Sequence, residues 1–125
     1  PLPNAEAMAY VEHSLVGLSL LADQPNYRHS MPTKILEYMA SGAVVVSTPL
    51  PLAVEVLHTD GVLLESFDAS ALPAAVAAIV ELADSDALRD ALTRRGFNRV
   101  AADYNWNVAG PQFVRALEHA ATGLA

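Results

Sequence analysis

Three short apolar runs constrain the fold of this chain more than any other feature of its sequence. They occupy residues 15–21, 43–47 and 61–64. A strand with one solvated face alternates apolar and polar residues, whereas a strand buried on both faces is apolar throughout. Longer segments with helical spacing separate the runs, and this alternation is typical of a parallel sheet covered by helices. The sequence therefore predicts an α/β fold with a Rossmann-like parallel sheet of about three strands and flanking helices.

Helix start and stop signals place helices between these strands. Asn4 is a candidate N-cap for a helix over residues 4–13. Pro32 is expected to open a helix that ends at Ala40, because Pro is favoured in a first turn and Gly42 follows as a C-terminal cap. A further short helix is expected over residues 52–58.

The C-terminal half is expected to be mostly helical. Apolar residues recur there at helical spacing, namely Leu72, Val76, Ile79, Val80 and Ala83. Ser85 is a candidate N-cap for a second helix, which carries on one side Leu88, Ala91, Leu92 and Val100. Pro111 is expected to open a third helix.

Charge and composition exclude several classes of protein. The net charge of −7 has the wrong sign for binding the phosphates of nucleic acid or an anionic membrane, so we expect no nucleic-acid partner. The absence of cysteine excludes disulfides and thiolate chemistry. No apolar stretch approaches the roughly 20 residues of a membrane span, so we expect no transmembrane segment. No signal peptide is visible, and we expect a cytoplasmic protein.

The number of expected strands bears on domain organisation. The 125 residues suit one domain, but an open nucleotide-binding sheet usually has about five or six strands. The start at Pro1, without Met, favours the second half of a larger sheet, so we expect residues 1–125 to form a single partial domain. The strand at 15–21 should then lie at an exposed edge, which would self-associate or be covered by the first helix.

Most signatures of catalysis are absent. The sequence has no glycine-rich phosphate loop, no nucleophile elbow and no local metal motif. We therefore expect no catalytic residue, no metal site and no cofactor in this chain.

The segment over residues 25–42 has a pattern that favours ligand binding. It follows a buried strand, so it should emerge at the carboxyl end of the sheet, where ligands bind in such folds. Lys34 lies in the first turn of the expected helix, where the macrodipole disfavours a cation. An anion held by Lys34 and the free amides of that turn would turn this misfit into a binding site. Arg28 and His29 add positive or protonatable groups to the same loop.

The two faces of this helix are expected to differ. Ile35, Leu36, Met39 and Ala40 can face the sheet, while the other face carries Lys34, Glu37, Tyr38 and Ser41. The alternative interpretation is a surface loop with a Lys34–Glu37 ion pair of little energetic weight.

The residues from Pro32 to Ser47 resemble the helix and strand of the nucleotide-sugar-binding domain in GT-B glycosyltransferases, most of all the large retaining family 4. The resemblance continues through the Glu55 region, residues 61–64 and the 68–83 helix to Tyr104-Asn105-Trp106, so it covers nearly the whole chain. It implies the second half of a GT-B C-terminal domain, with the acceptor-binding N-terminal domain lying outside this chain.

The resemblance also implies roles for individual residues. The glutamate that matches Glu37 accepts hydrogen bonds from the ribose hydroxyls in that family, and the helix N-terminus with its preceding loop faces the diphosphate and sugar. The substrate-binding residues implied here are Glu37, Lys34, Thr33, Ser30, His29 and Arg28. Many members carry an additional glutamate separated from the ribose glutamate by seven residues, and His29 holds that place here. The Ser-x-Pro-x-Lys form at Ser30, Pro32 and Lys34 resembles a variant of the family.

The activity implied by the resemblance is transfer of a sugar, with retention, from a nucleotide-diphosphate sugar donor to an acceptor, without an obligatory metal. This chain would supply the ribose site and part of the phosphate site, and alone it should be inactive. The base, the sugar and the acceptor stay open. Two alternatives also stay open: a sugar-nucleotide 2-epimerase of the same fold, and a non-catalytic α/β binding module.

Overall fold

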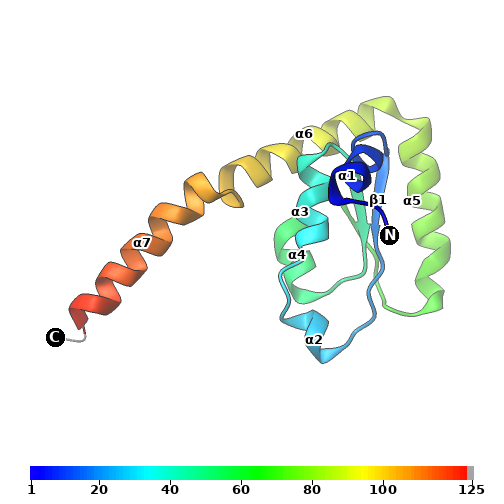
Figure 1. Ribbon diagram of the computed structural model, residues 1–125. Coiled ribbons are helices and arrows are strands. Elements are labelled where there is room, and N and C mark those ends of the chain that lie inside the picture. The colour runs from blue at the N-terminus through cyan, green and yellow to red at the C-terminus, as the bar shows by residue number, and fades with distance from the viewer. Residues whose placement is uncertain (124–125) are drawn as a thin grey trace.

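In a computed structural model of the protein, the structure is described for residues 1–123. Helices and strands alternate along the first half of the chain, and helices make up the second half (Figure 1). The elements are α1 (Asn4–Glu12), β1 (Val16–Ser19), α2 (Pro25–Arg28), α3 (Thr33–Ala40), β2 (Val44–Ser47), α4 (Pro51–Leu57), β3 (Val62–Leu63), the 3-10 helix η1 (Ala69–Ala71), α5 (Leu72–Asp84), α6 (Asp86–Asp103) and α7 (Trp106–Gly123).

The sheet is parallel and its strands follow in the order β1-β2-β3. Val16 pairs with Val44, and Val46 pairs with Val62. The prediction of an α/β fold with three adjacent parallel strands is therefore confirmed, although each strand is shorter than its apolar run. The segment between β1 and α3, expected from the sequence to be a loop, contains the short helix α2.

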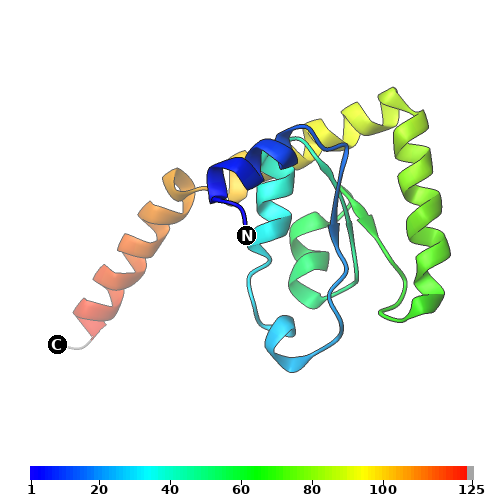
Figure 2. The same cartoon turned by 45° about the vertical axis from the view of Figure 1, so that its right-hand side comes forward.

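Helices cover both faces of the sheet. Helices α3 and α4 lie on one face, and α5 lies on the other (Figures 1 and 2). Val45 of β2 packs in one core cluster with Ile35 and Met39 of α3, whereas Val44 and Val46 pack in the opposite cluster. Successive side chains of a strand point to opposite faces, so burial of both faces requires the unbroken apolar run that the sequence shows.

Helix α6 crosses the amino ends of the strands and closes that end of the sheet (Figure 1). Arg99 donates from Nε to the Asp60 carboxylate at 2.6 Å, and Arg95 lies 3.3 Å from its other oxygen. Thr93 donates its hydroxyl to the Gly42 carbonyl at 3.1 Å. The carboxyl ends of the strands stay on the opposite side, where α2 lies.

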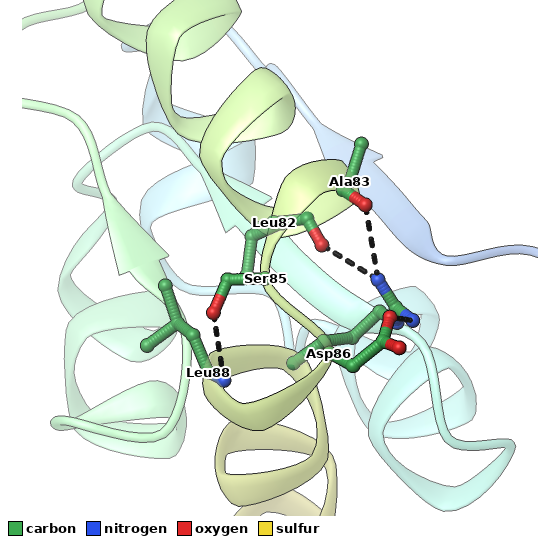
Figure 3. Close-up of polar contacts among 6 residues, drawn as sticks. Leu82, Ala83, Ser85, Asp86 and Leu88 are labelled. Atoms are coloured by element: carbon green, nitrogen blue, oxygen red, sulfur yellow. Dashed lines mark hydrogen bonds and ion pairs between the residues drawn. The ribbon is translucent and has the colours of Figure 1, made fainter.

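Polar contacts hold the corner between α5 and α6 (Figure 3). The Ser85 hydroxyl accepts a hydrogen bond from the Leu88 amide at 3.2 Å, which confirms the predicted N-cap. Arg89 donates to the carbonyl oxygens of Leu82 at 2.8 Å and Ala83 at 3.4 Å, and it also pairs with Asp86. The last carbonyls of α5, which have no partner within the helix, are satisfied in this way.

The predicted C-terminal cap of α3 is confirmed. Gly42 has a φ of +84°, the left-handed conformation that a residue with a side chain adopts only under strain. The Gly42 amide donates to the Met39 carbonyl at 3.4 Å, and the Ala43 amide donates to the Tyr38 carbonyl at 3.0 Å. This pair of bonds is a Schellman motif, and it turns the chain directly from α3 into β2.

The first helix begins at Asn4 as predicted, but the predicted N-cap at Asn4 and the predicted helix start at Pro111 are wrong. Pro3, rather than Asn4, is the N-cap of α1, because the Pro3 carbonyl accepts the first helical bond, from the Ala7 amide. Pro111 lies inside α7 and does not open it. The Asn105 side chain caps that helix by accepting from the Val108 amide at 3.2 Å, so the helix begins before the proline.

The buried side of α5 also differs from its apolar pattern. Ala75 and Leu82 are buried against the sheet, and Ile79 packs beside them. Three other apolar residues of the helix are more than half exposed, namely Leu72, Val76 and Val80. The apolar residues of α5 therefore cover two sides of the helix, and the sheet takes only one of them.

Strand β1 forms an edge of the sheet and keeps apolar side chains exposed. The leucines in and beside the strand are Leu15, Leu18, Leu20 and Leu21, exposed by 48%, 44%, 42% and 39%. Helix α1 contains no buried residue, so it does not cover these side chains. Within residues 1–123, no helix is both long enough and apolar enough to cross a membrane.

We predict that Asp60→Asn lowers the free energy of unfolding by about 1.5–3 kcal/mol, the usual contribution of hydrogen bonds to a charged group. The Asp60 carboxylate is buried and holds two guanidinium groups, so its replacement leaves both without a charged acceptor. Denaturant unfolding at pH 7 measures the change.

The matched control is Asp23→Asn, which breaks an ion pair at the surface. Exposed pairs contribute little, so this variant should unfold at the same denaturant concentration as the wild type. Equal losses in the two variants would show that the Asp60 cluster does not stabilise the fold.

Candidate functional site

A cavity of about 200 Å³ opens where β1 ends and α3 begins. The chain from Leu18 to Leu21 forms one wall, and the residues from Met31 to Lys34 form the other. The cavity therefore lies at the carboxyl end of the sheet, the place where ligands bind in open parallel α/β folds.

Buried hydroxyl groups hold the β1 wall of this cavity in place. Beyond the last paired residue of β1, the Thr48 side chain donates to the Leu21 carbonyl at 2.7 Å. Ser47 donates from its hydroxyl to the Ser19 carbonyl at 3.2 Å, and the Thr48 amide donates to the same oxygen at 3.1 Å. These bonds extend the contact between β1 and β2 past the strand ends. The chain from Ser19 to Leu21 is thereby held beside β2 although the paired strand has ended.

The first turn of α3 forms the opposite wall. The Pro32 carbonyl accepts from the Ile35 amide at 3.0 Å, and the Thr33 amide donates to the Met31 carbonyl at 2.9 Å. Within residues 1–123, the Lys34 amide has no intramolecular acceptor. This turn therefore offers a free amide and an exposed ammonium group at the positive end of a helix, a combination that suits an anion.

Glu37 lies on α3 one turn beyond the cavity. Its side chain is exposed and does not line the cavity. Among the ion pairs of residues 1–123 there is none between Lys34 and Glu37, so the ion pair of the alternative interpretation does not form. A spacing of three residues places the two side chains on the same side of the helix. Their charged groups are both free to meet a ligand.

Arg28 is directed toward an acidic neighbour. Its Nε and Nη2 atoms donate to the two carboxylate oxygens of Asp23 at 2.5 and 2.6 Å. The hydrogen bond from Arg28 lowers the pKa of Asp23 below its usual value, and the same bond raises the pKa of Arg28. Arg28 does not line the cavity at Lys34, so the structure does not bring these two basic residues together.

The other two predicted loop residues lie apart from the main cavity. Ser30 donates its hydroxyl to the Asn26 carbonyl and lines a neighbouring cavity of about 50 Å³, together with Tyr27 and Leu50. His29 ends α2, is exposed, and lines neither cavity. Of the six predicted binding residues, the structure therefore brings Thr33 and Lys34 together at the cavity and places Glu37 beside them.

Tyr38 does not lie on the polar face of α3, as the sequence pattern predicted. It is half-buried and packs with the core between α3 and the sheet. Its ring lies against Gly17 of β1, where an added Cβ would come within 2.3 Å of Cδ2. Ala40, predicted to face the sheet, is exposed instead. The helix is therefore rotated so that Tyr38 faces β1.

The sequence analysis did not identify Ser47 and Thr48, whose hydroxyl groups hold the β1 wall of the cavity in place. Ser47 and Thr48 end an apolar strand and carry no motif, so nothing in the sequence marked their hydroxyl groups. Gly17 did carry a signal, because a glycine inside a strand often marks the close approach of another group.

Within residues 1–123, no group of three His, Asp or Glu side chains could hold a metal ion. No curated protein matches the chain. A protein-family model described as "Glycosyl transferase-like" matches residues 1–122. The matched region includes the whole sheet, the cavity and all helices but the last residue of α7. This match supports a role in glycosyl transfer, and the chain belongs to the glycosyl transferase-like family.

Proposed function

We propose that this chain binds the nucleotide-diphosphate sugar donor of a GT-B glycosyltransferase of family 4, which transfers the sugar with retention. The observation that carries the proposal is the position of Thr33 and Lys34 at the cavity on the carboxyl end of the sheet. The family match supports glycosyl transfer, and the resemblance of residues 32–47 to the donor-binding helix and strand supports the finer assignment.

The charge distribution supports a diphosphate at this cavity. The chain carries seven basic residues against fourteen acidic ones, and Lys34 is the basic residue that lines the cavity. A free ammonium and a free amide in the first turn of α3 can each form a charge-assisted hydrogen bond to phosphate. An anion at this place would also cancel the unfavourable interaction between Lys34 and the helix dipole.

Glu37 is the proposed acceptor for the ribose hydroxyls. Its exposed carboxylate stands one helical turn from the phosphate-binding residues. A carboxylate accepts hydrogen bonds from two vicinal hydroxyl groups, and the ribose of a nucleotide presents such a pair next to its phosphates. The order along α3 therefore matches the order of groups in a nucleoside diphosphate.

The same residues would assist the chemical step. Breaking the bond between the donor sugar and the diphosphate leaves negative charge on the departing phosphate oxygen. The ammonium group and the free amide of Lys34 would stabilise that charge more strongly in the transition state than in the bound donor. Closure of an acceptor-binding domain over the cavity would exclude water and strengthen these interactions.

We propose further that residues 1–125 are the second half of a larger nucleotide-binding sheet. The Thr48 amide donates to the Ser19 carbonyl. Along a parallel strand, the backbone groups of successive residues point alternately to the two neighbouring strands. The backbone groups of Val16 and Leu18 therefore point away from β2, toward the open edge. A further strand at this edge, from another part of the sheet or from a second copy, would satisfy them.

The exposed apolar surface supports this arrangement. In a doubly wound sheet the strand order reverses at a switch point, and the two halves place their helices on opposite faces. Helices α3 and α4 cover one face here, and the other face carries the exposed residues Leu72, Val76 and Val80 of α5. Leu20 and Leu72 line one cavity, so this surface continues to β1. The first half of the proposed larger sheet would cover both the exposed side of α5 and the edge at β1.

We predict that Lys34→Ala weakens binding of a nucleoside diphosphate roughly tenfold and leaves binding of the nucleoside unchanged, because a charged hydrogen bond contributes about 1.5–3 kcal/mol. Chemical-shift titrations with uridine, guanosine and adenosine diphosphates and their nucleosides measure this, with wild-type dissociation constants on the order of millimolar. Arg94→Ala is the control. It removes an equal charge at an exposed position of α6 and should bind the ligands as the wild type does. Shifts that map away from residues 28–38 would contradict the proposal.

Glu37→Gln should weaken nucleoside and nucleoside diphosphate by the same factor, because the ribose is common to both ligands. The same titrations give the ratio of the two constants, which should equal the wild-type ratio. Glu81→Gln changes an exposed glutamate of α5 and should have no effect. A loss confined to the diphosphate would assign Glu37 to the phosphates and refute the ribose assignment.

The chain alone is expected to transfer no sugar from any nucleotide donor. Transfer needs an acceptor held in near-attack geometry inside a closed, dry cleft, and the proposed half-sheet provides only donor contacts. Incubation of purified residues 1–125 with nucleotide sugars and acceptor alcohols, followed by mass spectrometry, tests this. Turnover above the background without protein would overturn the half-sheet proposal.

A further inference from the structure

The Tyr38 ring of α3 lies directly against Gly17 of β1. An ideal Cβ at Gly17 would lie 2.3 Å from Cδ2 of Tyr38 and 2.4 Å from Cγ. Both distances are far below any real carbon contact. Because Gly17 is not in the left-handed region, glycine is needed here for space and not for backbone conformation. The aromatic ring occupies the volume that a side chain on β1 would fill.

This contact determines which part of α3 lies over the end of β1. Lys34 precedes Tyr38 by four residues, about 6 Å along a helix. Ser19 follows Gly17 by two residues, about 6.6 Å along a strand. A helix that runs back over its preceding strand therefore places Lys34 over Ser19 when Tyr38 lies over Gly17. The cavity agrees, because Lys34 and Ser19 both line it.

The remaining core contacts of α3 point to the middle of the sheet. Ile35 and Met39 are buried in the cluster that contains Val45 of β2. These contacts hold the helix on the sheet, but the cavity wall is β1. Tyr38 is the aromatic residue that ties the helix to that wall.

We propose that Tyr38 is a positioning residue for the donor site. Its ring, seated on Gly17, sets the height and register of α3 over β1 and thereby places Thr33 and Lys34 at the cavity. This inference rests on the proposed function of that cavity. The ring performs this role and its hydroxyl does not, so phenylalanine should replace it.

The test measures binding of the best of the three nucleoside diphosphates by four variants. Gly17→Ala and Tyr38→Ala should each weaken binding about tenfold, because a shift of the order of 1 Å disrupts charge-assisted contacts. Tyr38→Phe should bind as the wild type does. The fourth variant combines Gly17→Ala with Tyr38→Ala. It should bind no more weakly than Tyr38→Ala alone, because removal of the ring makes room for the Cβ at position 17.

Asp60→Asn is the control for lost stability, since Asp60 directly precedes β3 and so lies at the amino end of the sheet, away from the cavity. All titrations are made well below each unfolding temperature. Wild-type affinity in Gly17→Ala and Tyr38→Ala would overturn the inference. An equal loss of affinity in Asp60→Asn would also overturn it, by reducing the contact to a general contribution to stability.

A second readout separates this inference from the proposed function. The amide shifts of Thr33 and Lys34, recorded without ligand, should move in Gly17→Ala and Tyr38→Ala and should stay unchanged in Tyr38→Phe and Asp60→Asn. If the wild type binds no nucleotide but these shifts move as expected, the proposed function fails and the positioning of α3 by Tyr38 stands. Unmoved shifts in the first two variants refute the positioning.

Discussion

Burial of β2 on both faces is the constraint on which the rest of the structure depends. Its four residues are almost wholly inaccessible to solvent. Each buried valine side chain contributes about 1.5–3 kcal/mol relative to an exposed one, and only covered faces realise that gain. The strand therefore needs α3 and α4 on one side and α5 on the other, and its backbone groups need β1 and β3 at its edges.

The two ends of the sheet serve different purposes because they are closed differently. At the amino end, Asp60 binds two arginines of α6, so charges buried there are paired and the surface is sealed. At the carboxyl end, the Ser47 hydroxyl donates to Ser19 at the end of β1 and the Thr48 hydroxyl donates to Leu21 beyond it, and a cavity opens between this part of the chain and α3. The amino end is thus closed by paired charges, while the carboxyl end keeps the exposed Lys34 and its free amide at the cavity of the proposed site.

Helix α3 connects these two roles. One side of it is core, with Ile35 and Met39 buried against the sheet. Its first turn carries Lys34, a cation that the helix dipole disfavours at this end, beside an amide that has no acceptor within residues 1–123. Tyr38 lies between the two roles, since its ring belongs to the core while its contact with Gly17 sets where the first turn stands. Packing and the proposed binding site therefore meet in a single helix.

The sequence by itself determined the order of the strands and of every α-helix but α2, the parallel sheet and the caps at Gly42 and Ser85. These depend on periodicity and on hydrogen bonds between residues close in the chain, so the neighbours that decide them are visible in the sequence. It also marked Lys34 as a local misfit. Its errors at Asn4 and Pro111 came from choosing the wrong local start signal, because Pro3 is the N-cap of α1 and Asn105 caps α7.

Only the tertiary structure decided that Tyr38 faces β1, that Arg28 turns to Asp23, and that one apolar side of α5 stays uncovered. The pattern of a helix shows which residues are apolar, but the rotation of the helix depends on the partner it meets. For Tyr38 that partner is a glycine in an earlier strand, and the space above a glycine exists only once the strand is in the sheet. A site built from two distant segments depends on that packing, because each segment by itself lacks the opposing wall.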